Sequence, residues 1–145
     1  MTARPIHLQP IGSVHLDETG VWIDIAPGLR EALLGIEQFS HIEIYYWFHE
    51  NDTPELRRTL QVHPRKNPAN PLTGVFATRS PMRPNLLAHS VCRLIAVEGL
   101  RLRIEACDAR DGSPVIDIKG YFPSDIPADQ LRVPAWSRKA DAERT

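Results

Sequence analysis

Apolar and polar residues alternate along much of this chain, with the period of two that β-strands produce. The stretches that show the alternation are residues 21–25, 41–49, 74–80, 90–97, 100–107 and 115–122. Glu98 and Gly99 separate two of these stretches and predict a β-hairpin. Strands therefore dominate the predicted structure.

A helical period of 3.6 appears in one place only. Leu29, Ala32, Leu33 and Ile36 would form the apolar stripe of a short helix, and Gly35 weakens its end. Closure removes the exposed edges that a small sheet would otherwise present. We therefore expect a mainly β fold, a small closed or nearly closed β-barrel of six to seven strands with one short helix.

Stretch 41–49 is substantial on both of its faces. One face carries Ile42, Ile44, Tyr46 and Phe48, and the other carries His41, Glu43, Tyr45, Trp47 and His49. A strand of this kind is covered on both sides or lies at an interface.

Length and charge limit the classes of protein that fit. A chain of 145 residues, 42% hydrophobic, can bury a core unaided and predicts one domain, residues 1–145, with a proline-rich tail from residue 123. A formal net charge of −1 means that an RNA partner would need a local patch of Arg and Lys.

The N-terminus has no apolar leader, and no window approaches the roughly 20 apolar residues of a membrane span. We expect a soluble, cytoplasmic protein with no membrane partner.

Metal and nucleophile chemistry find little support in the sequence. Cys92 and Cys107 lie inside alternating apolar runs, which indicates reduced core thiols. The six histidines lack H-x-x-x-H spacing and there is no C-x-x-C pair, so no metal site is expected. Neither a Gly-rich phosphate loop nor a G-x-S-x-G elbow occurs.

A stiffened cationic loop interrupts the apolar pattern between residues 74 and 90. Pro81 and Pro84 restrict the backbone, so that Arg79, Arg83 and Asn85 project from a pre-organised frame. Such a frame suits recognition of a planar or anionic partner.

A second polar segment, DARDGSP, begins at Asp108. Its carboxylates would suit a ribose hydroxyl or an ammonium group, and Gly112 lets a ligand approach the backbone. Each polar turn taken alone is also explained as an ordinary solvated loop. Composition and spacing thus lead to a small β-barrel with a polar ligand site at one end.

Three long segments resemble the TsaA-like family, also called YaeB or TrmO, of S-adenosylmethionine-dependent tRNA N6-adenine methyltransferases. They read GLREALLGIEQFSHIEIYYWFH, GVFATRSPMRPN followed by SVCRL, and DARDGSPVIDIKGYFP, and they span residues 28–123 in family order. The resemblance implies a homodimeric β-barrel enzyme that methylates the exocyclic nitrogen of the threonylcarbamoyl-adenosine beside the tRNA anticodon. The alternatives are a methyltransferase for a small-molecule nucleophile and a non-catalytic S-adenosylmethionine-binding module.

The resemblance also implies site residues. Cofactor contacts would come from His49, Glu50, Arg79, His89, Asp108, Ala109, Arg110, Asp111 and Gly112. Substrate contacts would come from Arg83, Asn85, Arg65 and Lys66, with Arg57 and Arg58 as further partners for an RNA backbone. No general base is assigned.

The chain departs from the family pattern in three places. It lacks the N-terminal P-x-Q segment, and it carries Glu50 where many members have glutamine. It also reads RPNLLAHS where the family reads RPNPIGLS, which introduces His89. These departures bear on the substrate more than on the cofactor.

Overall fold

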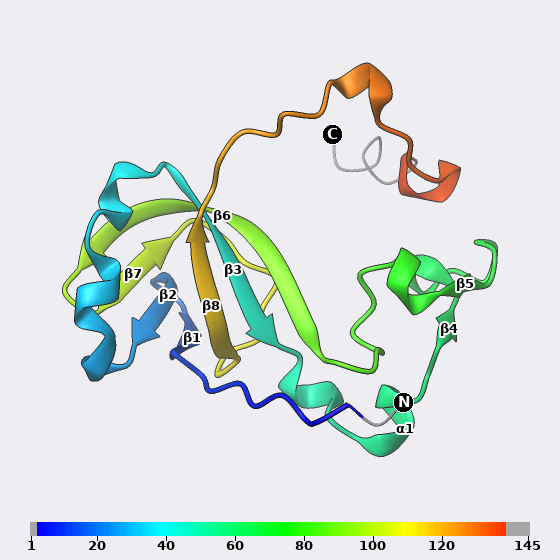
Figure 1. Cartoon of the computed structure of the whole chain (residues 1–145), viewed down its shortest axis with the longest axis horizontal. Coiled ribbons are helices and arrows are strands. Elements are labelled where there is room, and N and C mark those ends of the chain that lie inside the picture. The colour runs from blue at the N-terminus through cyan, green and yellow to red at the C-terminus, as the bar shows by residue number, and fades with distance from the viewer. Residues whose placement is uncertain (1–2, 139–145) are drawn as a thin grey trace.

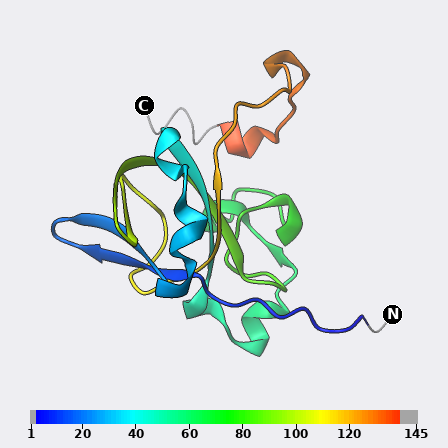
Figure 2. The ribbon, with the colours of Figure 1, turned by 60° about the vertical axis from the view of Figure 1, so that its left-hand side comes forward.

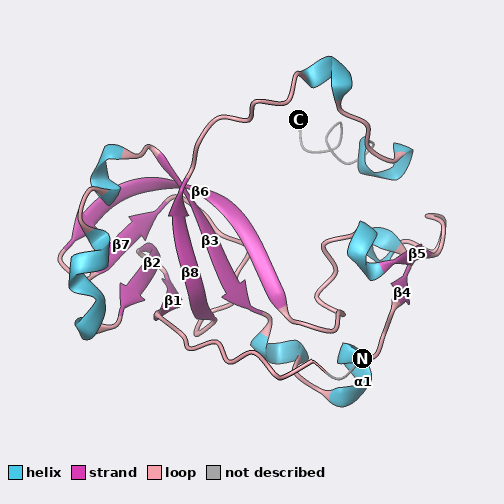
Figure 3. Cartoon of the chain, viewed as in Figure 1, coloured by secondary structure: helices cyan, strands magenta, loops and turns pink. Residues whose placement is uncertain are grey.

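A closed antiparallel barrel of six strands forms the body of the protein. The computed structural model describes residues 3–138 (Figures 1 and 3). The barrel strands are β1 (Gly12–Asp17), β2 (Gly20–Ile25), β3 (His41–Trp47), β6 (Leu87–Glu98), β7 (Arg101–Ile104) and β8 (Pro114–Gly120). They follow one another around the barrel in the order β1-β2-β7-β6-β3-β8. The predicted mainly β fold and closed barrel are confirmed.

The barrel interior is filled by the inward half of each alternating strand. In β3, Ile42, Ile44 and Tyr46 are buried while the residues between them are half-exposed. Ile23 of β2 and Leu102 of β7 are completely buried on the opposite part of the barrel order. Burying a side chain of this size stabilises the fold by about 1.5–3 kcal/mol. The period of two in the sequence thus becomes a dry core on one face of every strand.

Two hairpins shape the barrel, and the sequence predicted one of them. The β6–β7 hairpin turns at Gly99, whose φ of 63° suits a glycine, and confirms the prediction. The β1–β2 hairpin was missed, although Val14 and Leu16 alternate with polar neighbours there. The Asp17 carboxylate closes this second turn, because it accepts hydrogen bonds from the hydroxyl and the backbone N–H of Thr19. Both hydrogen bonds lower the pKa of Asp17.

Helical structure is confined to short turns. The predicted helix is two 3-10 helices, η1 (Pro27–Leu33) and η2 (Ile36–Gln38), separated at Gly35 with φ 88°. The other turns are η3 (His49–Asn51), α1 (Pro54–Arg57), η4 (Pro64–Lys66), η5 (Val75–Ala77) and η6 (Ala128–Gln130). No helix in the described part of the chain is both long and apolar enough to cross a membrane.

The chain between β3 and β6 forms a lobe beside one end of the barrel, here called the connecting lobe (residues 48–86; Figure 1). It contains a two-stranded sheet of β4 (Gln61–Val62) and β5 (Thr73–Gly74). The prediction of a strand over residues 74–80 is wrong, because the chain turns into η5 directly after β5. Thr78 Oγ1 donates to Val75 O and accepts from Ser80 N, so a side chain takes the place of a strand partner.

After β8 the chain leaves the barrel as an extended tail (Figures 1 and 2). Residues 121–135 are all exposed, and apolar side chains are among them. The most exposed are Phe122, Ile126 and Leu131. An ordered segment that presents this much apolar surface has the character of an interaction surface.

Candidate functional site

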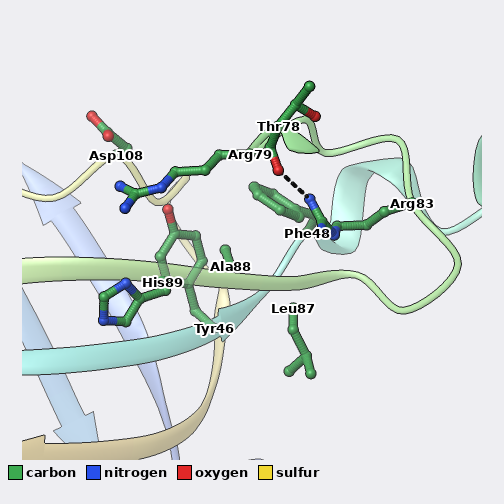
Figure 4. A pocket seen from close by; sticks show the side chains of 9 residues that line it. All are labelled: Tyr46, Phe48, Thr78, Arg79, Arg83, Leu87, Ala88, His89 and Asp108. Carbon is green, nitrogen blue, oxygen red and sulfur yellow. Dashed lines mark hydrogen bonds between the residues drawn. The ribbon is translucent and has the colours of Figure 1, made fainter. Parts of the chain in front are cut away.

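A cavity of about 310 Å³ lies where the end of β3, the start of β6 and the loop before β6 meet. It is lined by Tyr46, Phe48, Thr78, Arg79, Arg83, Leu87, Ala88, His89 and Asp108 (Figure 4). Two arginines, a histidine and an aspartate thus share one space with two aromatic rings. Cavities of this size and mixed lining hold small ligands and cofactors.

The loop over the cavity is held by its own side chains. Arg83 Nη1 donates to Thr78 O at 3.2 Å (Figure 4). It also donates to Ser80 O at 3.1 Å. Ser80 Oγ accepts from Met82 N at 3.1 Å. These bonds, together with Pro81 and Pro84, fix the loop before any ligand arrives.

The connecting lobe is tied to the same loop and to β3. Arg57 Nε donates to Pro84 O at 2.9 Å, while Arg57 Nη1 lies 3.1 Å from Asp52 Oδ1. Trp47 at the end of β3 donates through Nε1 to the other oxygen of Asp52 at 3.1 Å. The guanidinium of Arg57 also lies over the Trp47 ring, 5.7 Å from its centroid. The lobe therefore keeps a fixed position relative to the cavity.

The cavity floor belongs to the barrel core. The Tyr46 ring is buried and meets Phe48 edge-on, with 5.9 Å between ring centroids. Its hydroxyl lies 3.4 Å from Ser90 Oγ, and burial raises the pKa of Tyr46. The phenol stays neutral, so the floor offers aromatic surface and one hydroxyl.

The charged groups of the cavity come from three different segments. Arg79 extends from the loop, and Figure 4 draws its guanidinium between Asp108 and His89. Arg79 and Asp108 are exposed, and His89 is half-buried on β6. A cation, an anion and an imidazole thus face one ligand-sized space, which suits a ligand that carries both charges.

Four of the predicted site residues line the cavity, namely Arg79, Arg83, His89 and Asp108. Two other predicted cofactor contacts, Glu50 and Arg110, meet each other at the surface with 3.6 Å between Oε2 and Nε. His49 and Asn85 are exposed and lie outside the cavity lining. Among the predicted substrate contacts, Arg83 uses its guanidinium to hold the loop.

Three other residues of the DARDGSP turn, Ala109, Asp111 and Gly112, contact the barrel. Ala109 is buried in the core, and Asp111 Oδ1 accepts from Leu16 N at 2.8 Å. Gly112, with φ 80°, donates from its backbone to Val14 O at 2.8 Å. These residues anchor the turn on β1, which leaves Asp108 as its member in the cavity.

Arg65 and Lys66 lie in η4 of the connecting lobe, outside the cavity lining. Both have positive φ, 62° and 56°, which is unfavourable for side chains of this kind. The strained turn is braced on both sides: His63 Nδ1 lies 2.8 Å from Asn70 O, and Asn70 Nδ2 donates to Pro64 O at 2.8 Å.

Sequence reasoning did not assign Tyr46, Phe48, Thr78, Leu87 or Ala88 to the site. Tyr46 and Phe48 carried a usable signal, because they continue the apolar alternation of β3 to its end and one residue beyond it. The others adjoin Arg79 or His89 in the chain, and only the folded loop brings them to the cavity.

A second cavity of about 200 Å³ shares Asp108 with the first and is lined by both cysteines. Both thiols are free. The neighbouring Cys92 thiol, together with a hydrogen bond from Ala109 N at 3.4 Å, lowers the pKa of Cys107 to about 7. The hydrogen bond to Cys107 and burial raise the pKa of Cys92. Cys107 is therefore the reactive thiol of the pair.

Known proteins are similar to this chain in sequence and in fold. The sequence matches the family described as the tRNA-methyltransferase O N-terminal domain over residues 6–125. A probable S-adenosyl-L-methionine-binding protein of Pyrococcus horikoshii is 51% identical over 123 residues, which is 85% of this chain and 87% of the relative. The mouse tRNA (adenine(37)-N6)-methyltransferase is 43% identical over 93 residues, which is 64% of this chain and 21% of that enzyme.

The fold has solved counterparts as well. The crystal structure of TrmO from Pseudomonas aeruginosa matches with a TM-score of 0.69 at 29% identity, over 93% of this chain and 63% of that chain. The barrel and these relatives together define a β-barrel methyltransferase that depends on S-adenosylmethionine. Within that class the chain belongs to the TrmO family, and the family resemblance is confirmed.

The two thiols should differ in reactivity. Iodoacetamide is expected to alkylate Cys107 before Cys92, at a rate that rises as the pH passes about 7, because the thiolate is the nucleophile. Peptide mass spectrometry after short exposures on either side of that pH measures both sites. Cys107→Ser should remove the fast-labelling site. Labelling of Cys92 first would contradict the assignment of Cys107 as the more reactive thiol.

Proposed function

We propose that this chain methylates N6 of the threonylcarbamoyl-adenosine next to the tRNA anticodon. The observation that carries the proposal is the cavity under the fixed loop, where Arg79 and Asp108 oppose each other over an aromatic floor. The name of the mouse relative supports the substrate, and family membership supports the cofactor.

The lining residues fit S-adenosylmethionine in chemistry and in size. Arg79 can bind the carboxylate of its methionine end, and Asp108 can bind an ammonium or a ribose hydroxyl. The rings of Tyr46 and Phe48 offer faces for adenine or for a sulfonium cation. The volume of about 310 Å³ is at the small end for ligand cavities, so part of the cofactor would remain outside it.

When bound, S-adenosylmethionine supplies an electrophilic methyl group on a sulfonium. The chain contributes alignment, because the fixed loop and the β3 floor hold their side chains in one geometry before binding. The buried Tyr46 and the partly buried Phe48 exclude water from the deep end of the cavity. The adenosine itself lies in a single-stranded anticodon loop, from which a base can be turned out at modest cost.

The connecting lobe is our proposed contact for the RNA backbone. Arg65 and Lys66 project from the strained turn η4, and backbone strain of this kind concentrates at functional sites. Arg58 is an exposed cation of the same lobe. Phosphate contacts of this kind give affinity that falls with salt.

A labelling experiment tests the proposed function. The protein is incubated with methyl-labelled S-adenosylmethionine and threonylcarbamoylated tRNA, and label is expected in that tRNA but not in unmodified tRNA. The affinity for the tRNA should fall by at least tenfold between about 50 and 200 mM salt. In a variant that lacks both Arg65 and Lys66, the same increase in salt should lower the affinity by a smaller factor.

Two other outcomes would overturn the tRNA assignment. Label in a small-metabolite extract but not in tRNA would show a small-molecule methyltransferase, which the net charge of −1 favours. Tight cofactor binding without transfer to any acceptor would show a binding module, which matches the name of the Pyrococcus relative.

The role of Arg79 is tested separately. Arg79→Ala should weaken S-adenosylmethionine binding by about tenfold or more, because a charge-assisted hydrogen bond is lost. Calorimetry measures the affinity, and thermal unfolding should be nearly unchanged because Arg79 is exposed. Arg30→Ala, an exposed arginine on η1, is the matched control. A collapse of the unfolding temperature would instead make Arg79 structural.

We also propose that the chain works as a homodimer. The exposed tail and the outer face of β6 present apolar residues, including Phe122, Ile126, Val91 and Ile95, that a second copy would cover. Sedimentation velocity should give a single species of twice the 16.4 kDa chain mass. Phe122→Ser with Ile126→Ser should shift it toward the monomer. A wild-type monomer at micromolar concentration would refute the dimer.

A further inference from the structure

His89, which lines the cavity, forms a pair with Glu43 that the cofactor assignment does not explain. His89 Nε2 lies 3.4 Å from Glu43 Oε1. Their side chains are 34% and 26% exposed, so both are partly withdrawn from water. They stand on adjacent strands, since Glu43 pairs with Val91 and Tyr45 pairs with His89 in the β3–β6 ladder.

The surroundings fix the orientation of the imidazole. The Tyr45 ring lies beside the imidazole, with 5.0 Å between the two ring centroids. On the other side of β3, Lys119 of β8 places its Nζ 5.6 Å from the centroid of the Tyr45 ring. Arg79 and Asp108 are the charged groups that share the cavity lining with His89. A histidine held between a carboxylate and an aromatic ring, with one side toward a ligand cavity, has the arrangement of a general base.

The proposed reaction releases a proton, because the acceptor nitrogen carries an N–H, and a group that accepts this proton would speed the transfer. Glu50 is engaged by Arg110, and the Tyr46 phenol is kept neutral by its raised pKa. Asp108 is the other carboxylate of the lining, and it is the natural partner for a cationic end of the cofactor.

We propose that His89 is the catalytic base of methyl transfer and that Glu43 is its positioning residue. This inference rests on the proposed function. In the tautomer with its proton on Nε2, the imidazole faces Glu43 with that N–H and keeps a lone pair on Nδ1. As the new N–CH₃ bond forms and the S–CH₃ bond breaks, the N–H proton of the acceptor passes to Nδ1. The sulfonium becomes a neutral thioether, and the positive charge moves to the imidazolium, which the Glu43 carboxylate stabilises.

His89→Ala tests the base. It is expected to lower kcat by about 100-fold or more, the usual contribution of a general base. Added imidazole should restore part of the rate, because it can enter the space of the lost ring. Calorimetric affinity for S-adenosylmethionine should stay within about twofold, since the ring is assigned to the proton and not to the cofactor. His41→Ala, which changes a histidine on the face of β3 that carries Glu43, is the matched control with unchanged kcat.

Glu43→Gln tests the positioning role. It should lower kcat by about tenfold and leave cofactor affinity unchanged, because the imidazolium loses its charged partner.

The outcomes separate the base from the proposed substrate. The assays use whichever acceptor takes label from the wild-type protein, so failure with tRNA overturns the proposed function and leaves the test of His89 in force. A cofactor affinity more than tenfold weaker in His89→Ala would make His89 a cofactor contact and overturn the base. An unchanged kcat, or a loss that imidazole does not relieve, would overturn it as well.

Discussion

Closure of the barrel depends on a short seam between its first and last strands. β1 and β8 pair through only two positions, Gly12 with Val115 and Ser13 with Pro114. The DARDGSP turn completes the seam, because Val14 N donates to Ser113 O at 2.9 Å and the buried Ser113 hydroxyl donates to Arg110 O at 2.7 Å. Without these bonds the sheet would have two open edges, and the cavity would lose the segment that carries Asp108.

The loop before β6 and the DARDGSP turn therefore each contain two kinds of residue, those that hold the backbone and those that face the cavity. In the loop before β6, Arg83 holds backbone carbonyls while Arg79 faces the cavity. In the turn after Cys107, Asp111 holds β1 while Asp108 faces the cavity. A motif of this kind is specific to its fold because most of its polar atoms are committed to building one backbone shape.

The barrel could be predicted from the sequence because its signal is local. Alternation in stretches such as residues 41–49 directly sets which side chains enter the core. The strand expected over residues 74–80 was wrong because Thr78 and Ser80 satisfy the backbone through their hydroxyls, which hydrophobic pattern does not register. The pairing of Glu43 with His89 could not be predicted either. It depends on the register of β3 against β6, which joins residues distant in the chain.

That same register has an evolutionary consequence. Backbone atoms make the hydrogen bonds between β3 and β6, and the side chains of Leu87 and His89 on β6 line the cavity. Exchanging either residue leaves the strand pairing and the seam between β1 and β8 in place. A few positions of one strand can therefore change the side chains at the cavity, while the barrel itself is kept.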